Sequence, residues 1–285
     1  MKIGIIGLGK MGQNHLNELT KNPHFKINAL FDLVQNEKSH QPFFNKLEDF
    51  LKQKNDIIII ATPTNSHLEL AKKVFPYCKN VLIEKPLALN LNEISQIINL
   101  AQKHQVKLAV GFCERFNPAL ISLKQDLYDQ EIISINIRRF SSYPQRIHDV
   151  GILHDLSVHD LDLLTFLSKQ NILKTNLLKK YTQDPKKESE SIFLCELEKS
   201  IASIHQSWNS TQKLRKLHLI TQKHFYEANL NDFSLFKDGK PLKTNQQSPL
   251  FGQHEALLNL ANNKPHHLAN AYDAYKIQEI LERFI

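Results

Sequence analysis

The sequence predicts an α/β fold: a doubly wound parallel sheet in an N-terminal domain, then an α+β domain with a mainly antiparallel open sheet. Strand-like and helix-like runs alternate through about the first 115 residues, the pattern of a parallel sheet covered by helices on both faces. Several strand-like runs with short turns follow, which favours antiparallel pairing. The 285 residues suit two domains, because domains cluster near ~100 to 150 residues. We therefore expect domains at residues 1–115 and 116–285.

In the first domain, strands and helices follow one another along the chain. Ile57 to Ile60 form an unbroken apolar run, which is typical of a strand buried on both faces. The same reasoning predicts strands at Lys2–Ile6, Lys26–Phe31, Asp56–Ala61, Val81–Ile83 and Lys107–Phe112. Helical patterns cover the stretch from a glycine turn to about Asn22, then Leu68–Phe75 and Leu91–His104.

The second domain shows a different order of predicted strands and helices. Residues 131–140 alternate strictly enough to predict a half-buried strand with Ile133, Ile135 and Ile137 on one face. Further strands are expected at Ser191–Glu196, Ser200–Trp208, Lys216–Thr221, His224–Leu230 and Phe233–Lys237, the last closed by Asp238-Gly239. Helices are expected at Pro118–Asp129, about Ser157–Leu167, Gln253–Asn262 and about Leu268–Ile285.

Composition argues against several classes of protein. Cys78, Cys113 and Cys195 lie far apart without a C-x-x-C pair, so they favour a reducing compartment and support no disulfide framework or cysteine-based zinc site. No apolar run approaches the roughly 20 residues that span a bilayer, and the first residues lack the pattern of a signal peptide. The net charge of +7 admits a nucleic-acid-binding protein, but the lysines are scattered and no recognised motif accompanies them. We expect a soluble, cytoplasmic protein with no membrane or nucleic-acid partner.

Glycine is scarce in this chain, and half of it stands in the first twelve residues. Gly7-x-Gly9-x-x-Gly12 follows a predicted strand and opens a predicted helix, with Asp32 twenty residues beyond at the end of the second strand. That is the full context of a dinucleotide-binding Rossmann turn. A glycine-rich turn that binds no nucleotide is the structural alternative.

Each residue of this turn has a physical role in the nucleotide interpretation. Gly7 allows the tight turn, Gly9 lets the backbone approach a pyrophosphate, and Gly12 permits close packing. Lys10 and Met11 begin the helix, whose N-terminal amides face the phosphates. Asp32 would accept hydrogen bonds from ribose hydroxyls and would repel a 2′-phosphate, so the sequence favours NAD over NADP as the cofactor.

Three further segments carry polar side chains. Ala61-Thr62-Pro63-Thr64-Asn65-Ser66-His67 and Glu84-Lys85-Pro86 each follow a buried strand, at the sheet edge where ligands bind. Residues 155–162 (DLSVHDLD) open a helix of the second domain. Together with the glycine turn, these segments resemble the Gfo/Idh/MocA family of NAD(P)-dependent sugar and cyclitol oxidoreductases over essentially the whole chain.

The resemblance implies roles for individual residues. It implies a catalytic group of Lys85, Asp155 and His159, and a cis bond before Pro86. On the nicotinamide side of the cofactor it implies contacts from Thr62, Pro63, Asn65, His67, Glu84 and Lys85.

Residue chemistry supports the catalytic assignment independently. Oxidation of a secondary alcohol needs a base near neutral pH, and histidine has an ordinary pKa of about 6.5. Asp155 and His159 are four residues apart and share one face of a helix. Lys85 would hydrogen-bond the reacting hydroxyl and stabilise negative charge on its oxygen.

Each of these residues also has a simpler interpretation. Lys85 would be a solvated turn residue, and His159 would be a structural histidine. Asp155 and Asp162 would stabilise a helix N-terminus, where carboxylates are favourable. His148, His154 and His159 suggest a metal site, but no local H-E-x-x-H or Cys/His spacing accompanies them, so we expect no metal. No G-x-S-x-G elbow supports serine hydrolase chemistry.

Residues 111–118 (GFCERFNP) and 149–154 (DVGILH) resemble the branch of the family that acts on nucleotide-linked amino sugars. This likeness implies oxidation at C3 of a sugar such as UDP-N-acetylglucosamine, with cyclitols, free sugars or a non-catalytic NAD sensor as alternatives. Substrate contacts are expected from Arg115, Asn117, Arg146 and His159. Arg115, Arg138, Arg139 and Arg146 would suit a diphosphate, although Arg138 and Arg139 equally fit a solvated strand face.

The family resemblance also implies a homo-oligomer, a dimer or tetramer, that uses the open sheet face of the second domain. The chain departs from the family pattern in its short length and in Ser157, where many members carry glycine.

Overall fold

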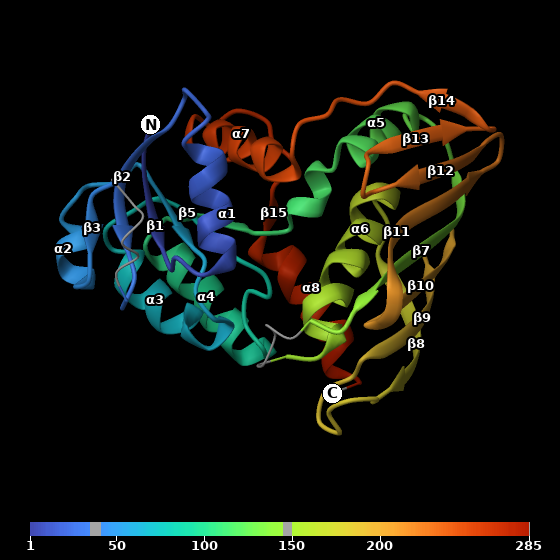
Figure 1. The fold of residues 1–285 in the computed structure, drawn as a ribbon, viewed down its shortest axis with the longest axis horizontal. Coiled ribbons are helices and arrows are strands. Elements are labelled where there is room, and N and C mark those ends of the chain that lie inside the picture. Colours follow the sequence, from blue (N-terminus) through green and yellow to red (C-terminus); the bar gives the residue numbers. More distant parts are fainter. Residues whose placement is uncertain (35–40, 145–149, 285) are drawn as a thin grey trace. The chain divides into compact units, whose positions relative to one another are not determined.

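The computed structural model describes residues 1–34, 41–144 and 150–284 of the chain (Figure 1). The chain divides into two compact units. Unit 1 combines Met1–Cys113 with Leu250–Glu282, and unit 2 combines Glu114–Pro249 with the last residues from Arg283. The predicted α/β class is confirmed, with one mainly parallel sheet and one mainly antiparallel sheet.

Unit 1 is built on a seven-stranded sheet whose strand order is β15-β6-β5-β4-β1-β2-β3. All pairs are parallel except the one between β15 and β6. The strands are β1 (Lys2–Ile6), β2 (Lys26–Phe31), β3 (Phe43–Phe44), β4 (Ile57–Ile60), β5 (Asn80–Ile83), β6 (Lys107–Val110) and β15 (Ala269–Asn270). Because β1 lies between β2 and β4, the strand order reverses there, and such a switch point is where open α/β sheets bind ligands.

Helices connect these strands and add the C-terminal part of unit 1. They are α1 (Lys10–Leu19), α2 (Leu47–Leu51), η1 (Thr64–Ser66), α3 (His67–Val74), α4 (Leu91–Lys103), α7 (Pro249–Ala261) and α8 (Ala271–Glu282). Every residue of β4 is buried, as expected for a central strand covered on both faces.

Unit 2 contains an eight-stranded sheet in the order β14-β13-β12-β11-β7-β10-β9-β8. Its pairs are antiparallel except that β7 and β10 run parallel. The strands are β7 (Ile132–Ser142), β8 (Ile172–Lys180), β9 (Glu190–Leu197), β10 (Ile201–Ser207), β11 (Asn209–Thr221), β12 (Phe225–Asn229), β13 (Ser234–Lys237) and β14 (Lys240–Leu242).

Helices of unit 2 pack on one face of this sheet, as Figure 1 shows for α5 and α6. They are η2 (Cys113–Phe116), α5 (Pro118–Asp126), the π-helical turn η3 (Leu153–Ser157) and α6 (Val158–Ser168). The other face of the sheet carries exposed apolar side chains, including Leu194 and Ile201.

The C-terminal helices differ from the predicted division at residue 115, because α7 and α8 belong to unit 1. Ala269 pairs with Val110 at the edge of the parallel sheet, and Gln278 Nε2 donates to the carbonyl of Leu89 at 2.9 Å. Helix α8 also packs against α4. Periodicity identifies the apolar face of α8 but not the helix that covers this face. The sequence therefore did not reveal that the C-terminal helices pack on unit 1.

Strand β8 was not predicted, and one predicted face is partly wrong. Residues 172–180 (ILKTNLLKK) lack alternation and carry three lysines, which suits an edge strand but hides it from a periodicity search. Ile135 and Ile137 are buried as expected, whereas Ile133 is exposed and Ile132 is buried instead. The pairing of β7 with β11 shifts register between Ile220 and Thr221. This shift exchanges the faces to which the side chains at the start of β7 point.

Candidate active site

The glycine turn after β1 is shaped by close backbone contacts. Gly7 has φ +90°, where L side chains are strained, and a Cβ there would lie 2.7 Å from Thr62 Cγ2. A Cβ on Gly12 would lie 1.9 Å from the carbonyl oxygen of Gly7. A Cβ on Gly9, in contrast, would meet no protein atom within 4 Å. The protein leaves open space in front of Gly9, where the Rossmann motif places a pyrophosphate.

Helix α1 begins directly at this open space. Gly9 is its N-cap and makes no side-chain cap, so no side chain of the cap residue occupies the amides of the first turn. Lys10, the first helical residue, is exposed and Met11 is half-buried. A helix N-terminus of this kind attracts an anion through its N–H groups and its dipole.

Asp32 lies beside the same turn. Its Oδ2 accepts a 2.6 Å hydrogen bond from the backbone amide of Leu8, and its Oδ1 accepts one of 2.6 Å from the amide of Leu33. Oδ1 also accepts a longer bond of 3.4 Å from the amide of Val34. A carboxylate oxygen has two acceptor positions, so Oδ2 retains capacity for a ribose hydroxyl. The glycine turn, the open helix end and the anchored carboxylate together fit the adenosine and diphosphate parts of a dinucleotide.

The loop after β4 is ordered by its own side chains. The hydroxyls of Thr62 and Ser66 lie 2.7 Å apart, and Ser66 also donates to the carbonyl of Pro63 at 2.7 Å. Pro63 and Asn65 are exposed. The predicted contact side chains therefore lie in a fixed loop beside Gly7.

His67 connects this loop to the next one. Its Nε2 lies 3.0 Å from the carbonyl of Thr62, and its Nδ1 lies 3.2 Å from the carbonyl of Leu87. Burial lowers the pKa of His67, although the carbonyls that accept from its ring act in the opposite direction. At 1% exposure, His67 orders two loops in this conformation, in place of the direct cofactor contact that the resemblance implied.

The Glu84-Lys85-Pro86 segment follows β5, and the Lys85–Pro86 bond is cis, which confirms the expectation. The Glu84 carboxylate is 4% exposed and lies against Gly111, where a Cβ would come within 2.6 Å of it. Its Oε1 lies 2.9 Å from His15 Nε2, and its Oε2 accepts from the backbone amide of Lys85 at 3.2 Å. Glu84 thus holds the backbone beneath Lys85, while the Lys85 side chain is half-buried.

Asp155 and His159 stand at the start of the long helix of unit 2. Asp155 belongs to the π-helical turn η3, in which the amide of Val158 bonds to the carbonyl of Leu153, and His159 belongs to the first turn of α6. Asp155 is half-buried and His159 is 8% exposed. The sequence predicted an ordinary helix from Ser157, and the π turn, a feature frequent at functional sites, was not foreseen.

Helix α6 is buried on nearly all sides, yet it contains Asp160 and Asp162. Arg139 Nη2 lies 2.5 Å from Asp160 Oδ1, and Gln206 Nε2 donates to Asp160 Oδ2 at 2.5 Å. Arg115 binds Asp162 through two nitrogens, with Nε 2.8 Å from Oδ2. Buried acids need such partners, so these bonds fix the helix that presents His159.

Glu114 extends this network. Burial alone would raise its pKa, but Arg215 and Arg139 together hold the pKa below its ordinary value. The three arginines and three acids balance one another in charge. Two acids inside a helical run rich in leucine (VHDLDLL) were the sequence signal that could have revealed this network.

These bonds change the roles expected for the substrate residues. Arg115 is 7% exposed and paired with Asp162, while Asn117 caps α5 by accepting from the amide of Ala119 at 3.1 Å. Arg139 is neither a diphosphate ligand nor part of a solvated face, because it is buried against Asp160. Arg138 lies on the opposite face of the sheet, and its neighbours in register are His205 of β10 and Lys216 of β11. Arg146 lies outside the described residues.

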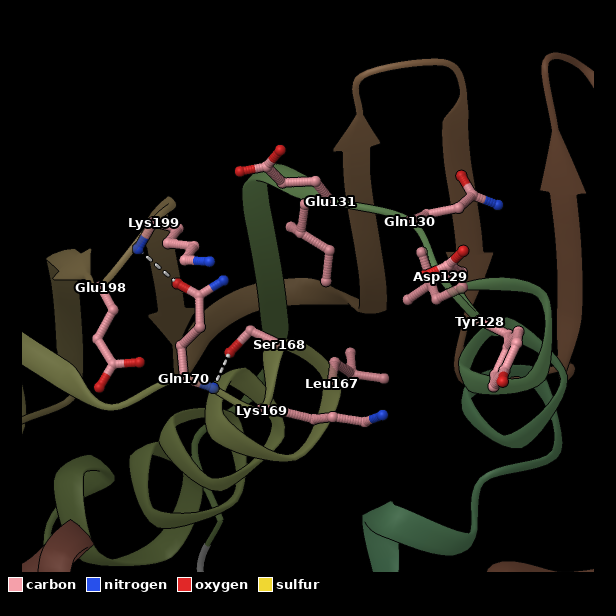
Figure 2. A pocket seen from close by; sticks show the side chains of 12 residues that line it. Tyr128, Asp129, Gln130, Glu131, Leu167, Ser168, Lys169, Gln170, Glu198 and Lys199 are labelled. Carbon is pink, nitrogen blue, oxygen red and sulfur yellow. Dashed lines mark hydrogen bonds between the residues drawn. The ribbon is translucent and has the colours of Figure 1, made fainter.

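A hollow of about 650 Å³ lies at the far end of α6 (Figure 2). Its wall includes the loop between α5 and β7, the end of α6 at Ser168–Gln170, and the turn at Glu198 and Lys199. Gln170 accepts from the amide of Lys199 at 2.8 Å, as Figure 2 shows. The part of α6 that follows His159, residues 160–168, rises roughly 14 Å toward this hollow, so the hollow is distinct from the candidate catalytic segment.

Across residues 1–34, 41–144 and 150–284, no group of three or more His, Cys, Asp and Glu side chains is arranged to hold a metal ion. In the same ranges, no helix is long and apolar enough to cross a membrane.

Sequence comparison places the first 112 residues in a known family. They match the family model described as "Oxidoreductase family, NAD-binding Rossmann fold" (GFO_IDH_MocA). An uncharacterized oxidoreductase of Bacillus subtilis, YrbE, is 31% identical over 179 residues, covering 58% of this chain and 52% of that protein.

Two relatives carry named activities. The UDP-N-acetylglucosamine 3-dehydrogenase of Acidithiobacillus ferrooxidans is 28% identical over 175 residues, which cover 59% of this chain and 54% of that protein. The myo-inositol 2-dehydrogenase of Thermotoga maritima is 27% identical over 190 residues, covering 60% and 56%. In these alignments the chain spans about half the length of the curated relatives that it matches.

The fold is shared over a longer range than the sequence. A solved structure of the UDP-N-acetylglucosamine 3-dehydrogenase GnnA from Acidithiobacillus ferrooxidans superposes with a TM-score of 0.90, covering 99% of this chain and 96% of that one at 20% identity. Both units therefore follow the architecture of that protein. Residues 1–112 thus match the Gfo/Idh/MocA family of oxidoreductases in sequence, and both units share the fold of a solved UDP-N-acetylglucosamine 3-dehydrogenase.

Proposed function

We propose that this protein is an NAD-dependent dehydrogenase that oxidises a secondary hydroxyl of a sugar. The observation that carries the proposal is the coexistence of a Rossmann turn open in front of Gly9 with the Glu84-Lys85-Pro86 and Asp155–His159 segments of the family. A non-catalytic NAD sensor would need the first feature and not the others.

The proposed cofactor sites follow from unit 1. Gly7, Gly9 and Gly12 shape the turn, the amides from Lys10 and Met11 face the diphosphate, and Asp32 accepts from the ribose. Leu33 and Val34, the residues after Asp32, provide no positive charge for a 2′-phosphate, which supports NAD over NADP. Thr62, Pro63, Asn65 and Glu84 are proposed to line the nicotinamide side.

The proposed chemistry assigns one task to each catalytic residue. When bound, NAD supplies the acceptor for a hydride from the substrate carbon. His159 takes the proton of the hydroxyl, and Asp155 orients His159 from four residues earlier. Lys85 donates a hydrogen bond to the hydroxyl oxygen and stabilises the negative charge that develops on it.

The proposed substrate is a nucleotide-linked amino sugar oxidised at C3, such as UDP-N-acetylglucosamine. The relative from Acidithiobacillus ferrooxidans, which is matched in sequence and in fold, supports this choice. A cyclitol is the second candidate, because the relative from Thermotoga maritima is a myo-inositol 2-dehydrogenase of nearly equal similarity. Arg115 and Asn117 already serve the fold, so other residues must bind the diphosphate.

We also propose a homo-oligomer built on the open face of the sheet in unit 2. Exposed apolar side chains gather on that sheet, namely Ile133, Leu178, Leu194, Ile201, Ile220, Phe225 and Phe236. Exposed apolar side chains on the open face of a sheet suit an interface between subunits.

A substrate panel tests the function. The full chain should form NADH with NAD and UDP-N-acetylglucosamine, more slowly with inositols, and much more slowly with NADP. A parallel assay with an added 2-oxoacid detects turnover by a cofactor that stays bound and is recycled. His159→Ala and Lys85→Ala should lose turnover by ~10²-fold or more and keep NAD binding within about threefold. Wild-type turnover in either variant would contradict the catalytic assignment.

A further inference from the structure

Two buried histidines lie behind the Glu84-Lys85 segment, and the proposed chemistry does not use them. His15 comes from α1, and His254 comes from α7, 239 residues later in the chain. Figure 1 shows these two helices side by side in unit 1. His15 Nδ1 lies 2.8 Å from His254 Nε2, and His15 Nε2 lies 2.9 Å from Glu84 Oε1. Both histidines are fully buried, and Glu84 is 4% exposed.

The donors and acceptors of Glu84, His15 and His254 allow few arrangements of the hydrogens on the two imidazole rings. The Glu84 carboxylate is an acceptor, so the Nε2 of His15 must carry the hydrogen that points toward it. The other nitrogen of His15 then needs a partner, and His254 Nε2 is at hydrogen-bond distance from it. Burial holds the pKa of His254 well below its ordinary value, with the charge of His15 as a smaller cause, so His254 is neutral. A neutral imidazole can satisfy His15 Nδ1 either as donor or as acceptor.

The carboxylate at the end of this group is held from three sides. His15 binds Oε1, the amide of Lys85 binds Oε2, and the backbone of Gly111 lies so close that no Cβ fits between them. A change at His15 or His254 therefore reaches the backbone of Lys85 through one carboxylate. Of these groups, only Lys85 touches the sugar in the proposed reaction, through its side chain.

We propose that His15 and His254 are positioning residues, which fix the Glu84 carboxylate and through it the backbone of Lys85. The proposal rests on the proposed role of Lys85 in sugar oxidation. It also explains why helix α7 completes unit 1: this helix supplies the last member of a hydrogen-bonded chain that ends under the catalytic lysine.

Matched substitutions separate the hydrogen bond from the packing. Glutamine places an amide near the Nε2 position of histidine and can donate or accept, whereas leucine fills volume and can do neither. The variants are His254→Leu, His254→Gln, His15→Leu and His15→Gln in the full chain. Glu255→Ala is the control, because it removes a different bond of α7, the 2.7 Å contact with Asn22, and leaves the histidines in place.

The first readout does not depend on any substrate. Labelling glutamate at the carbonyl carbon and lysine at nitrogen selects the three Glu-Lys pairs of the sequence, and Lys85→Arg identifies the signal of Lys85. The Lys85 amide signal should move in both leucine variants and stay within a line width of wild type in both glutamine variants and in Glu255→Ala. Melting temperatures identify variants that do not fold. If a His15 variant does not fold, the comparison of His254→Leu with His254→Gln tests the proposal.

The second readout is kinetic. His254→Leu should lower kcat about tenfold or more and change KM for NAD less than about threefold, while His254→Gln keeps at least about half of the wild-type kcat. An unmoved Lys85 signal in the leucine variants, or equal losses of kcat in leucine and glutamine variants, would overturn the proposal. If the Lys85 signal responds as expected but wild type oxidises no sugar, the positioning of Lys85 stands and the proposed function is wrong.

Discussion

Gly9 and Gly12 stand three residues apart in one turn, yet alanine should affect them in opposite ways. A Cβ on Gly9 enters open space, so Gly9→Ala should keep the wild-type melting temperature and weaken NAD binding about tenfold or more, because the methyl group occupies the pyrophosphate position. Gly12→Ala forces a Cβ against the Gly7 carbonyl and should unfold at a lower temperature. Thermal unfolding and NAD titration of both variants test this contrast. Unchanged NAD affinity in folded Gly9→Ala would contradict the assigned pyrophosphate position.

Lys124 provides a test of pH dependence. Its amine lies 3.5 Å from the centre of the Phe166 ring and donates to the Phe166 carbonyl at 2.6 Å. Burial, with Lys169 and Arg115 as further causes, lowers its pKa from 10.5 to about 8. Between those values the unfolded chain binds more protons than the folded chain, so the contribution of Lys124 to stability rises with pH and is least favourable below about pH 8.

The expected result is a difference between two proteins. Relative to Lys124→Met, the free energy of unfolding of wild type should increase from about pH 7.5 to about pH 9.5. Urea unfolding of both proteins at each pH measures this difference and cancels other titrating groups. A difference that stays constant or falls with pH would show that Lys124 is not desolvated in the folded state.

At the scale of residues, the sequence supplied the chemistry but not the contacts. Spacing was enough to place Gly7, Gly9 and Gly12 in one turn with Asp32 beside it, because their order along the chain follows from the motif. The partners of Arg115 and Arg139 depend on which acids of α6 face them, and no local pattern contains that information. An arginine beside a predicted site therefore looked like a diphosphate ligand, although each is paired with a buried acid.

At the scale of elements, helix α6 depends on its buried ion pairs. Arg139→Leu would leave the carboxylates of Asp160 and Glu114 with less compensation in a buried site and should cost about 3–5 kcal/mol of unfolding free energy. Adding Asp160→Asn removes one of those charges, so the double variant should lose less than Arg139→Leu alone. Urea unfolding measures both.

Arg138→Leu is the matched control for this experiment. Arg138 precedes Arg139 on the same strand but lies on the other face of the sheet, so its loss should change stability by about 0.5 kcal/mol or less. Equal destabilisation by Arg138→Leu and Arg139→Leu would mean that the ion pairs under α6 do not account for its stability.

Elements with strong local signals were predicted well, and those without were missed. Strands β1 and β2 match the predicted bounds, because short apolar runs between turn residues mark them. The short strand β3 and the short helix α2 are too brief for any periodicity, and the lysine-rich strand β8 is stabilised by pairing with β9 rather than by burial of its own side chains. The π turn depends on how the backbone bonds at Leu153 and Val158, which side-chain patterns do not record.

At the scale of the whole molecule, the open sheet face of unit 2 predicts self-association. We expect light scattering to give a mass that is an integer multiple, two or four, of the 33.0 kDa chain. Leu194→Asp puts a charge on a residue that is 56% exposed, so it should lower that mass and leave the fold and NAD binding intact. A wild-type protein that is monomeric at micromolar concentration would contradict the proposed interface.

The fate of a single hydrogen atom tests the proposed dehydrogenase activity. If the chain oxidises C3 of UDP-N-acetylglucosamine, the hydrogen on that carbon must appear in the reduced cofactor, while the hydroxyl proton passes to His159 and then to water. UDP-N-acetylglucosamine deuterated at C3 should therefore yield NADH carrying one deuterium by mass spectrometry, and His159→Ala should yield none above background. Unlabelled NADH from the labelled sugar, or no NADH from any sugar or cyclitol tested, would contradict the account.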